Sequence, residues 1–335
     1  MRQILVTGGA GYLGSHVVEK LLNRGYKVRI LDNLSFGDKA LKLLKKKYNF
    51  ELINGDIRDL RIILQSMEGI DAVIHLAGIV GDPASKIDPV KSTEVNYLST
   101  KLVVDTAKYF KIKQFIFASS CSVYGASNSH ILNESSKLNP LSIYAETKLK
   151  SEKVLLDSNG KDFSPTIFRA GTFFGYSNRM RFDLVVNLFV GQAISKHKIV
   201  VEGGDQWRPF IHVVDAADAY VLALEKTRSK MKGIFNLGAD ELNHQLKEIA
   251  KFVKSSIPDV RVEQSNNTDR RNYRVSFAKI KKTLGFRAEK SVTDGIAEIK
   301  NAIVSGKIRS WENPIYYNNR FPLTGKNKTS KYYWK

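Results

Sequence analysis

The stretch Val6-Thr7-Gly8-Gly9-Ala10-Gly11-Tyr12-Leu13-Gly14 decides the fold of this chain. It follows the apolar run of residues 4–6 and precedes a segment with apolar side chains at helical spacing. A strand, a tight turn and a helix are therefore predicted in that order. The glycines of the turn stand three residues apart, at Gly8, Gly11 and Gly14. Such a turn brings the backbone close to a pyrophosphate, which the free N–H groups of the helix N-terminus bind.

A second predicted strand, residues 26–32, ends in the carboxylate Asp32. In a dinucleotide-binding fold, an acid at this place accepts a hydrogen bond from a ribose 2′-hydroxyl and repels a 2′-phosphate. The glycine turn and Asp32 together predict a site that prefers NAD to NADP.

Residues 1–175 alternate between strand and helix patterns. The predicted strands are 3–7, 26–32, 50–54, 71–77, 114–120 and 165–170, and the predicted helices are 12–24, 38–47, 59–67, 92–109 and 142–157. This rhythm is typical of a parallel sheet with helices on both faces. The sequence thus predicts an α/β protein built on a Rossmann-type doubly wound parallel sheet. Ligands bind such sheets at the carboxyl ends of the strands.

After residue 175 the rhythm is mixed. Helices are predicted near 181–195, 213–226, 243–255, 276–284 and 293–305, with strands at 199–201 and 233–237. We expect an NAD-binding Rossmann domain over residues 1–175 and a smaller mixed α/β substrate lobe over residues 176–310. Residues 211–238 are expected to pack back on the Rossmann domain. The polar, aromatic-rich tail, residues 311–335, is expected to be partly disordered.

The composition restricts the class of protein. The chain has 335 residues and a formal net charge of +20, but the basic residues are spread along its whole length. No zinc-ligand spacing or aromatic nucleic-acid signature accompanies them, so neither a metal site nor nucleic-acid binding is expected. No apolar run approaches the ~20 residues that cross a bilayer. The first strand begins by residue 3 and the single cysteine fits a reducing cytosol, so we expect a cytoplasmic protein.

Tyr144 and Lys148 stand four residues apart on a predicted helix and therefore share one face. A neutral tyrosine is a poor base because its unperturbed pKa is about 10. A nearby ammonium, reinforced by a positively charged nicotinamide, favours the phenolate and makes tyrosine a usable general acid or base. The serine-rich turn Ser119-Ser120-Cys121-Ser122 follows a buried strand and brings hydroxyls to the same edge of the sheet.

In combination these segments resemble the extended short-chain dehydrogenases/reductases. The resemblance is to their NAD-dependent nucleotide-sugar epimerase/dehydratase family, which includes UDP-glucose 4-epimerases. It runs from residue 1 to about residue 305. It rests on the segments Thr7 to Gly14, Asp56 to Asp59, His75 to Gly78, Ser119 to Gly125, Tyr144 to Lys148 and Arg208 to Val213.

The resemblance implies roles by position. Ser120, Tyr144 and Lys148 match the catalytic hydroxyl, the acid/base and its activator. The NAD ligands would be Gly8, Gly11, Tyr12, Leu13, Gly14, Asp32, Asn33, Asp56, Ile57, Leu76, Ala77, Gly78, Asn96, Tyr144 and Lys148. A nucleoside-diphosphate sugar would be held by Ser122, Thr172, Asn187, Arg208 and Arg271. The guanidinium groups suit the diphosphate because they bind phosphate oxygens in a bidentate way.

Two residues narrow the reaction. Dehydratases of the family carry an Asp-Glu pair directly after the catalytic hydroxyl residue, where this chain has Cys121 and Ser122. Decarboxylases of the family tend to carry Glu in place of Ser122. Other members use a catalytic cysteine two residues before the tyrosine that matches Tyr124. Cys121 lies three residues before it, so its side chain is predicted to point away from the site.

We therefore expect a nucleotide-sugar epimerase that acts at C4 of a nucleoside-diphosphate hexose through a transient 4-keto intermediate. One alternative is an NAD(P)H-dependent ketoreductase of 4-keto-6-deoxysugar nucleotides, which would use the same catalytic residues. Another is a catalytically silent NAD-binding scaffold, against which the intact Ser120, Tyr144 and Lys148 argue. The resemblance also implies a homodimer packed through the helices at 92–109 and 142–157.

Overall fold

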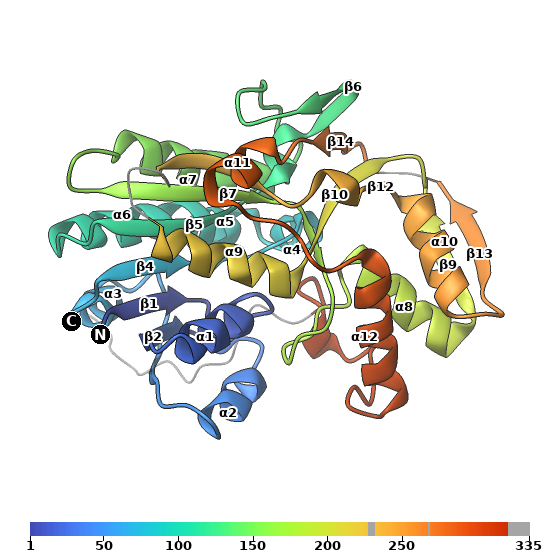
Figure 1. The fold of residues 1–335 in the computed structure, drawn as a ribbon, viewed down its shortest axis with the longest axis horizontal. Helices are drawn as coiled ribbons and strands as arrows, with labels where there is room; N and C mark the ends of the chain where they lie inside the picture. Colours follow the sequence, from blue (N-terminus) through green and yellow to red (C-terminus); the bar gives the residue numbers. More distant parts are fainter. Residues whose placement is uncertain (227–231, 267–268, 321–335) are drawn as a thin grey trace.

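A seven-stranded parallel sheet forms the centre of the molecule (Figure 1). The structure, a computed structural model, describes residues 1–226, 232–266 and 269–320. The strand order is β11-β7-β5-β4-β1-β2-β3. The strands are β1 (Gln3–Thr7), β2 (Lys27–Asp32), β3 (Glu51–Asn54), β4 (Ala72–His75), β5 (Gln114–Ser120), β7 (Ser164–Ala170) and β11 (Gly233–Leu237). The predicted α/β Rossmann-type fold is confirmed. The strand order reverses at β1, where such sheets open a crevice for ligands.

Alternate residues of β1 point into two separate cores, one on each face of the sheet. Ile4 and Val6 pack on the side of α1 (Gly14–Asn23), α2 (Lys39–Lys45) and α9 (Val213–Glu225). Leu5 packs on the side of α3 (Leu60–Met67), α6 (Ser99–Tyr109) and α7 (Ile143–Asp157). All three side chains are fully buried, so β1 and the glycine turn that follows it are held rigidly.

The predicted helix 92–109 is not one regular helix. It consists of α5 (Pro89–Thr93), a π-helical turn over Glu94–Leu98, and α6. A π-turn adds a residue to the helical repeat and occurs frequently at functional sites. Here it contains Asn96, which is buried and faces the loop after β4.

Three small sheets lie outside the central sheet (Figure 1). They are β8 (Thr172–Phe174) with β10 (Trp207–His212) and β12 (Asn243–Gln245); β9 (Lys198–Glu202) with β13 (Arg261–Ser265); and β6 (Ala126–Leu132) with β14 (Asn272–Val275). The helices are α8 (Val185–Lys196), α10 (Leu246–Ser256), α11 (Ala278–Leu284) and α12 (Val292–Val304), with α4 (Asp82–Ile87) in the first half. We propose a lobe boundary near residue 175, with β11 at the edge of the central sheet and α9 packed against that sheet. The described residues after 175, apart from α9 and β11, are called the second lobe below.

Other predicted segments also differ from the structure. The helix expected over 181–195 begins only at Val185, because Arg181 and Asp183 pair side by side in the loop before it. The start of the expected disordered tail is packed. Trp311 and Tyr317 are buried, and the Phe182 N–H donates to the Tyr316 carbonyl at 2.9 Å. Residues 321–335 lie outside the described residues. No helix of the described chain is long and apolar enough to cross a membrane.

Candidate active site

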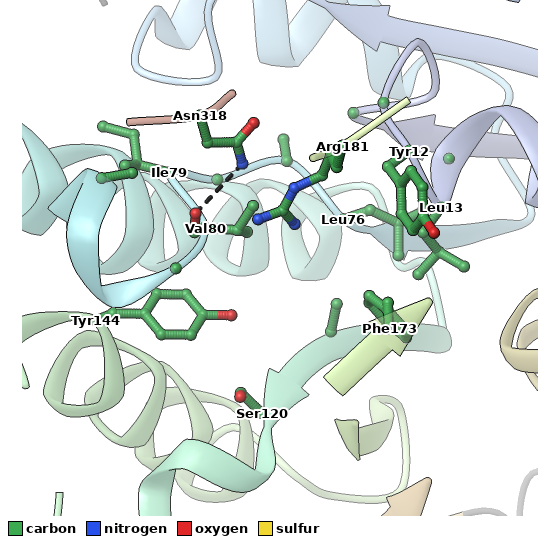
Figure 2. A pocket seen from close by; sticks show the side chains of 18 of the residues that line it. Tyr12, Leu13, Leu76, Ile79, Val80, Ser120, Tyr144, Phe173, Arg181 and Asn318 are labelled. Atoms are coloured by element: carbon green, nitrogen blue, oxygen red, sulfur yellow. Dashed lines mark hydrogen bonds between the residues drawn. The ribbon is translucent and has the colours of Figure 1, made fainter. Parts of the chain in front are cut away.

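A cavity of about 1200 Å³ lies at the carboxyl ends of the central strands, between the sheet and the second lobe (Figure 2). Its lining includes residues at or just after the ends of β1, β2, β4, β5 and β7, namely Gly8, Asp32, Leu76, Ser120 and Ala170. Arg208 and Arg271 of the second lobe line the opposite side. The fold thus brings most of the predicted site residues to a single cavity.

The glycine turn leaves room where side chains would collide. A Cβ on Gly8 would lie 2.7 Å from the Ala77 nitrogen, and one on Gly14 would lie 2.0 Å from the Gly8 carbonyl oxygen. Gly8 also has a φ of 75°, which favours glycine. No side chain caps the N-terminus of α1. This close packing and the uncapped helix end fit a dinucleotide diphosphate at this turn.

Asp32 holds the glycine turn and the loop after β2 together, next to the place expected for the dinucleotide. Its carboxylate accepts hydrogen bonds from the Ala10 N–H at 2.9 Å and the Leu34 N–H at 2.8 Å. Burial raises the pKa of Asp32, while these two donors act in the opposite direction. Asn33 and Ile57 line the same cavity, as does Asp56, whose carboxylate is paired with Arg58 at 2.8 Å.

Asn96 does not line the cavity, although it was expected to touch the cofactor. Its amide accepts from the Ile79 N–H at 2.8 Å and donates to the Ile79 carbonyl at 2.9 Å. It therefore fixes the loop that carries Leu76, Ala77 and Gly78, all of which line the cavity. The geometry assigns Asn96 a positioning contact.

Tyr144 and Ser120 face the same part of the cavity (Figure 2). Ser142 caps the N-terminus of α7 by accepting from the Ala145 N–H at 3.2 Å, which fixes the first turn that carries Tyr144. Lys148, one turn later, donates to the Ala118 carbonyl at 2.8 Å and lies 5.9 Å from the Tyr144 ring centroid. The three residues proposed for catalysis therefore lie together.

Burial dominates the electrostatics of Tyr144. Burial, assisted by the charge of Asp82, raises the pKa of Tyr144 to about 12, although Arg181, the hydrogen bond with Ser120 and Arg271 act to lower it. Burial also lowers the pKa of Lys148 to about 8. Burial is the largest influence on Tyr144, so forming the phenolate requires positive charge that offsets desolvation. The expectation that the ammonium of Lys148 and a positively charged nicotinamide supply this charge stays a prediction.

The expected substrate residues separate into two groups. Ser122, Thr172, Arg208 and Arg271 line the cavity. Asn187 does not; its buried amide donates to the Tyr12 hydroxyl at 3.2 Å and to the Arg181 carbonyl at 2.8 Å. Its observed contacts join the second lobe to the glycine turn.

The two arginines expected to bind a diphosphate share one carboxylate. Arg208 pairs with Asp269 at 2.9 Å, and Arg271 pairs with the same carboxylate at 2.5 Å. Arg271 also contacts Asp82, across the cavity at the start of α4. Attraction to the arginines outweighs burial and depresses the pKa of Asp269. The structure thus presents two adjacent cations on one wall of the cavity.

Sequence reasoning gave no individual role to several charged residues of this cavity. Arg179 and Arg181 come from the loop between β8 and α8, and Asp82 comes from the loop after β4. Figure 2 shows the Arg181 side chain reaching toward the space between Tyr144 and Tyr12. The signal was the run Arg179-Met180-Arg181-Phe182-Asp183, in which charged residues alternate with apolar ones between a strand and a helix. Nothing local indicates that this loop folds over the sheet.

Cys121 is buried beneath the cavity wall. Its thiol donates to the Arg169 carbonyl at 3.2 Å, and burial raises its pKa. It is absent from the cavity lining. Among the residues that the structure describes, no group of three or more His, Cys, Asp or Glu side chains could hold a metal ion.

Comparison with known proteins places this site in a family. Residues 4–238 match the model of the NAD-dependent epimerase/dehydratase family. The chain belongs to that family. The predicted cofactor class, NAD, and the resemblance to the epimerases are thereby confirmed. Membership leaves the reaction open, since the family includes both epimerases and dehydratases.

Individual relatives of the family cover nearly the whole chain. The UDP-glucose 4-epimerase of Bacillus subtilis (strain 168) is 30% identical over 321 residues, covering 88% of this chain and 95% of that protein. The UDP-glucuronic acid decarboxylase 1 of Arabidopsis thaliana is 32% identical over 319 residues, covering 90% and 71%. The crystal structure of the Thermus thermophilus UDP-glucose 4-epimerase in complex with NAD has a TM-score of 0.77 and 25% identity, covering 90% of this chain and 100% of that one.

Proposed function

We propose that this protein is an NAD-dependent nucleotide-sugar epimerase that acts at C4 of a nucleoside-diphosphate hexose through a transient 4-keto intermediate. The observation that carries the proposal is one cavity that joins Ser120, Tyr144 and Lys148 to the arginine pair Arg208 and Arg271. A hydroxyl-bearing substrate anchored by a diphosphate fits such a cavity. Relatives that are 4-epimerases of UDP-sugars support this choice.

Bound NAD supplies a hydride acceptor and a positively charged nicotinamide. In our proposal Tyr144 takes the proton of the sugar hydroxyl, and Ser120 hydrogen-bonds the same oxygen. Because burial places the pKa of Tyr144 at about 12, forming the phenolate near neutral pH requires nearby positive charge. Lys148 provides part of this charge and fixes the site by its bond to the β5 backbone.

The arginines explain how both faces of the sugar could be reached. Arg208 is anchored by the Trp207 and Arg271 carbonyls as well as by Asp269. A diphosphate held by Arg208 and Arg271 would stay in place while the keto sugar rotates about its link to the phosphate. Reduction on the opposite face then gives the epimer, with Tyr144 returning the proton.

The residues after Ser120 weigh against the other reactions of the family. Cys121 is buried away from the cavity, and Ser122 is a hydroxyl where dehydratases and decarboxylases use an acid. The Ser122 oxygen is buried and has no hydrogen-bond partner within the described residues, so it is available to a substrate hydroxyl. A ketoreductase of 4-keto sugars remains the second candidate because it would share Ser120, Tyr144 and Lys148.

The deciding experiment combines two measurements on freshly purified protein. Mass identification of the nucleotide released on denaturation, with NAD present at one equivalent, supports an internally recycled cofactor. Interconversion of C4 epimers of nucleoside-diphosphate hexoses without added NADH then supports the epimerase. An empty site together with NADH-dependent reduction of a 4-keto sugar nucleotide would favour the ketoreductase instead. Release of NAD from a protein that neither epimerises nor reduces would indicate the silent scaffold.

We also propose that the protein is a cytoplasmic homodimer packed through α6 and α7. The helical segment of α5, the π-turn and α6 exposes large apolar side chains, including Val90, Leu98 and Tyr109. Leu141 and Leu156, which flank or lie on α7, are exposed as well. Size-exclusion chromatography with light scattering tests this assembly, and a monomer at micromolar concentration would exclude it.

A further inference from the structure

Arg179 is a buried cation without a neutralising carboxylate among the described residues. The residue is only 6% exposed. The hydrogen bond that it donates runs from Nη2 to the amide oxygen of Asn318 at 2.6 Å, whereas Nε is buried without any partner. Asp32 and Asp183 attract it only over longer distances, and burial lowers its pKa to about 9. An unpaired buried charge is costly and is normally balanced by a counter-ion.

The position of Arg179 indicates where that counter-ion belongs. The guanidinium lies over the ring of Phe36, 3.9 Å from its centroid. Phe36 is in the loop that follows β2 and Asp32, so Arg179 reaches from the second lobe to the dinucleotide half of the cavity. It lines the cavity together with Gly11, Tyr12 and Asp32.

Asn318 holds the guanidinium in this position. Its Oδ1 accepts from Arg179, and its Nδ2 donates to the Val80 carbonyl at 3.3 Å, which Figure 2 shows at the edge of the cavity. The segment before it is fixed by the bond between Phe182 and Tyr316 and by the buried Trp311. A neutral amide orients the cation without neutralising it, which leaves its charge available to an anion.

We propose that Arg179 and Asn318 form a clamp over the diphosphate of the cofactor, in which Arg179 binds phosphate oxygens and Asn318 positions Arg179. The glycine turn contacts this diphosphate from the sheet side, and the clamp approaches from the second lobe and the C-terminal segment. A cofactor held from both sides dissociates slowly, as internal recycling requires. The inference rests on NAD binding and is independent of the sugar nucleotide, because its test needs no turnover.

The test measures binding of cofactor fragments to the full-length protein. NADH fluorescence reports the affinity for NADH, and displacement of NADH reports the affinities for ADP-ribose and adenosine. Calorimetric titration reports the affinity for UDP, which binds at the sugar-nucleotide site. In the Arg179→Gln variant, NADH and ADP-ribose should bind roughly 10- to 100-fold more weakly, the range expected for losing a charge-assisted hydrogen bond. Adenosine and UDP should bind as before, because neither contains the cofactor diphosphate.

Two further variants separate charge from shape. Asn318→Asp places a carboxylate against Arg179, so it should weaken ADP-ribose binding in the same way as Arg179→Gln. Arg179→Lys keeps the charge and should retain part of the affinity. Arg24→Gln, a surface arginine paired with Glu225, is the matched control and should leave all four affinities unchanged. Unfolding midpoints establish that each variant is folded.

Three results would overturn the clamp. An equal loss for adenosine and ADP-ribose would mean that Arg179 only supports the shape of the pocket. A loss for UDP with ADP-ribose unaffected would assign Arg179 to the diphosphate of the sugar nucleotide. Tighter ADP-ribose binding by Asn318→Asp would show that the C-terminal segment holds the cofactor by its packing and not through the charge of Arg179.

Discussion

Arg271 of the second lobe contacts Asp82 at the start of α4, so an ion pair spans the candidate active site. The other oxygen of Asp82 accepts from the hydroxyl of Ser142, the residue that caps the helix bearing Tyr144. A substrate diphosphate that uses Arg271 must therefore compete with Asp82. The same carboxylate faces Tyr144 and disfavours its ionisation.

Asp82→Asn should tighten the binding of a nucleoside diphosphate. The amide removes the competing charge but can still accept from Ser142, so the cap of α7 is preserved. We expect the dissociation constant of UDP to fall by about 3- to 10-fold, as for the loss of a partly solvated ion pair. Calorimetric titration of the holoenzyme measures it, with Asp105→Asn on the exposed face of α6 as the control. Weaker binding would mean that Asp82 holds Arg271 in its productive position.

Tyr144→Phe should lower turnover by roughly 100- to 10,000-fold, the usual contribution of a positioned acid or base. Ser120→Ala should lower it less, because the phenol remains. Steady-state assays across C4-epimeric sugar nucleotides measure both effects. Tyr48→Phe removes a phenol whose hydrogen bond to Asn23 is on the surface, so it controls for the substitution itself. Full activity of Tyr144→Phe would exclude the proposed acid/base.

Arg208→Lys should raise the Michaelis constant about 10-fold or more while changing kcat much less. Lysine keeps the charge but loses the planar fork that can bind two phosphate oxygens at once. It also loses the bonds to the Trp207 and Arg271 carbonyls. Initial-rate kinetics test the split between the two constants, and Arg287→Lys on the exposed surface is the control. An unchanged Michaelis constant would separate Arg208 from the substrate.

Protonation of the Glu298 carboxylate should make the protein less stable in acid. Burial alone would raise its pKa, but the hydrogen bond from His212, at 2.9 Å, and that from Lys290 outweigh burial and hold the pKa at about 2. Because this folded-state pKa is below the ordinary value of 4.5, the stabilisation is fully present above about pH 4.5 and is lost as the pH falls toward 2. After allowing for partial exposure, we expect about 1–2 kcal/mol.

Urea unfolding of the wild type and of Glu298→Gln between pH 7 and pH 3 measures this effect. The difference in free energy of unfolding should be largest near neutral pH and should shrink in acid. Glu241→Gln, at an exposed position, controls for the change in net charge. A difference that does not vary with pH would contradict the assignment to Glu298.

Much of the candidate site was predictable because its signals are local. The spacing of Gly8, Gly11 and Gly14, the strand that ends at Asp32, and the pair Tyr144 and Lys148 each need only a few neighbouring residues to be recognised. In a parallel sheet the carboxyl ends of all strands lie at one edge. Local patterns therefore sufficed to place these residues in one cavity.

The remaining features depended on contacts between distant segments. Asn187 and Asn96 match site positions in the sequence, yet packing turns their amides toward Tyr12 and the Ile79 backbone. The raised pKa of Tyr144 depends on its burial in the folded protein, which helical spacing does not encode. Likewise, a π-turn differs from an α-helix by a local shift in hydrogen bonding that side-chain periodicity does not show.

The sequence by itself determined the fold class, the edge of the sheet that carries the site, the preference for NAD and the catalytic residues that we propose. Periodicity, glycine spacing and chemical type are properties of short segments, and the fold of those segments preserves them. Only the tertiary structure decided that Arg179 meets Asn318 and that Arg271 meets Asp82. These pairs join residues 139 and 189 positions apart (318 − 179 and 271 − 82). Such contacts arise from how whole lobes and loops pack, because burial and charge pairing depend on every segment that closes around them.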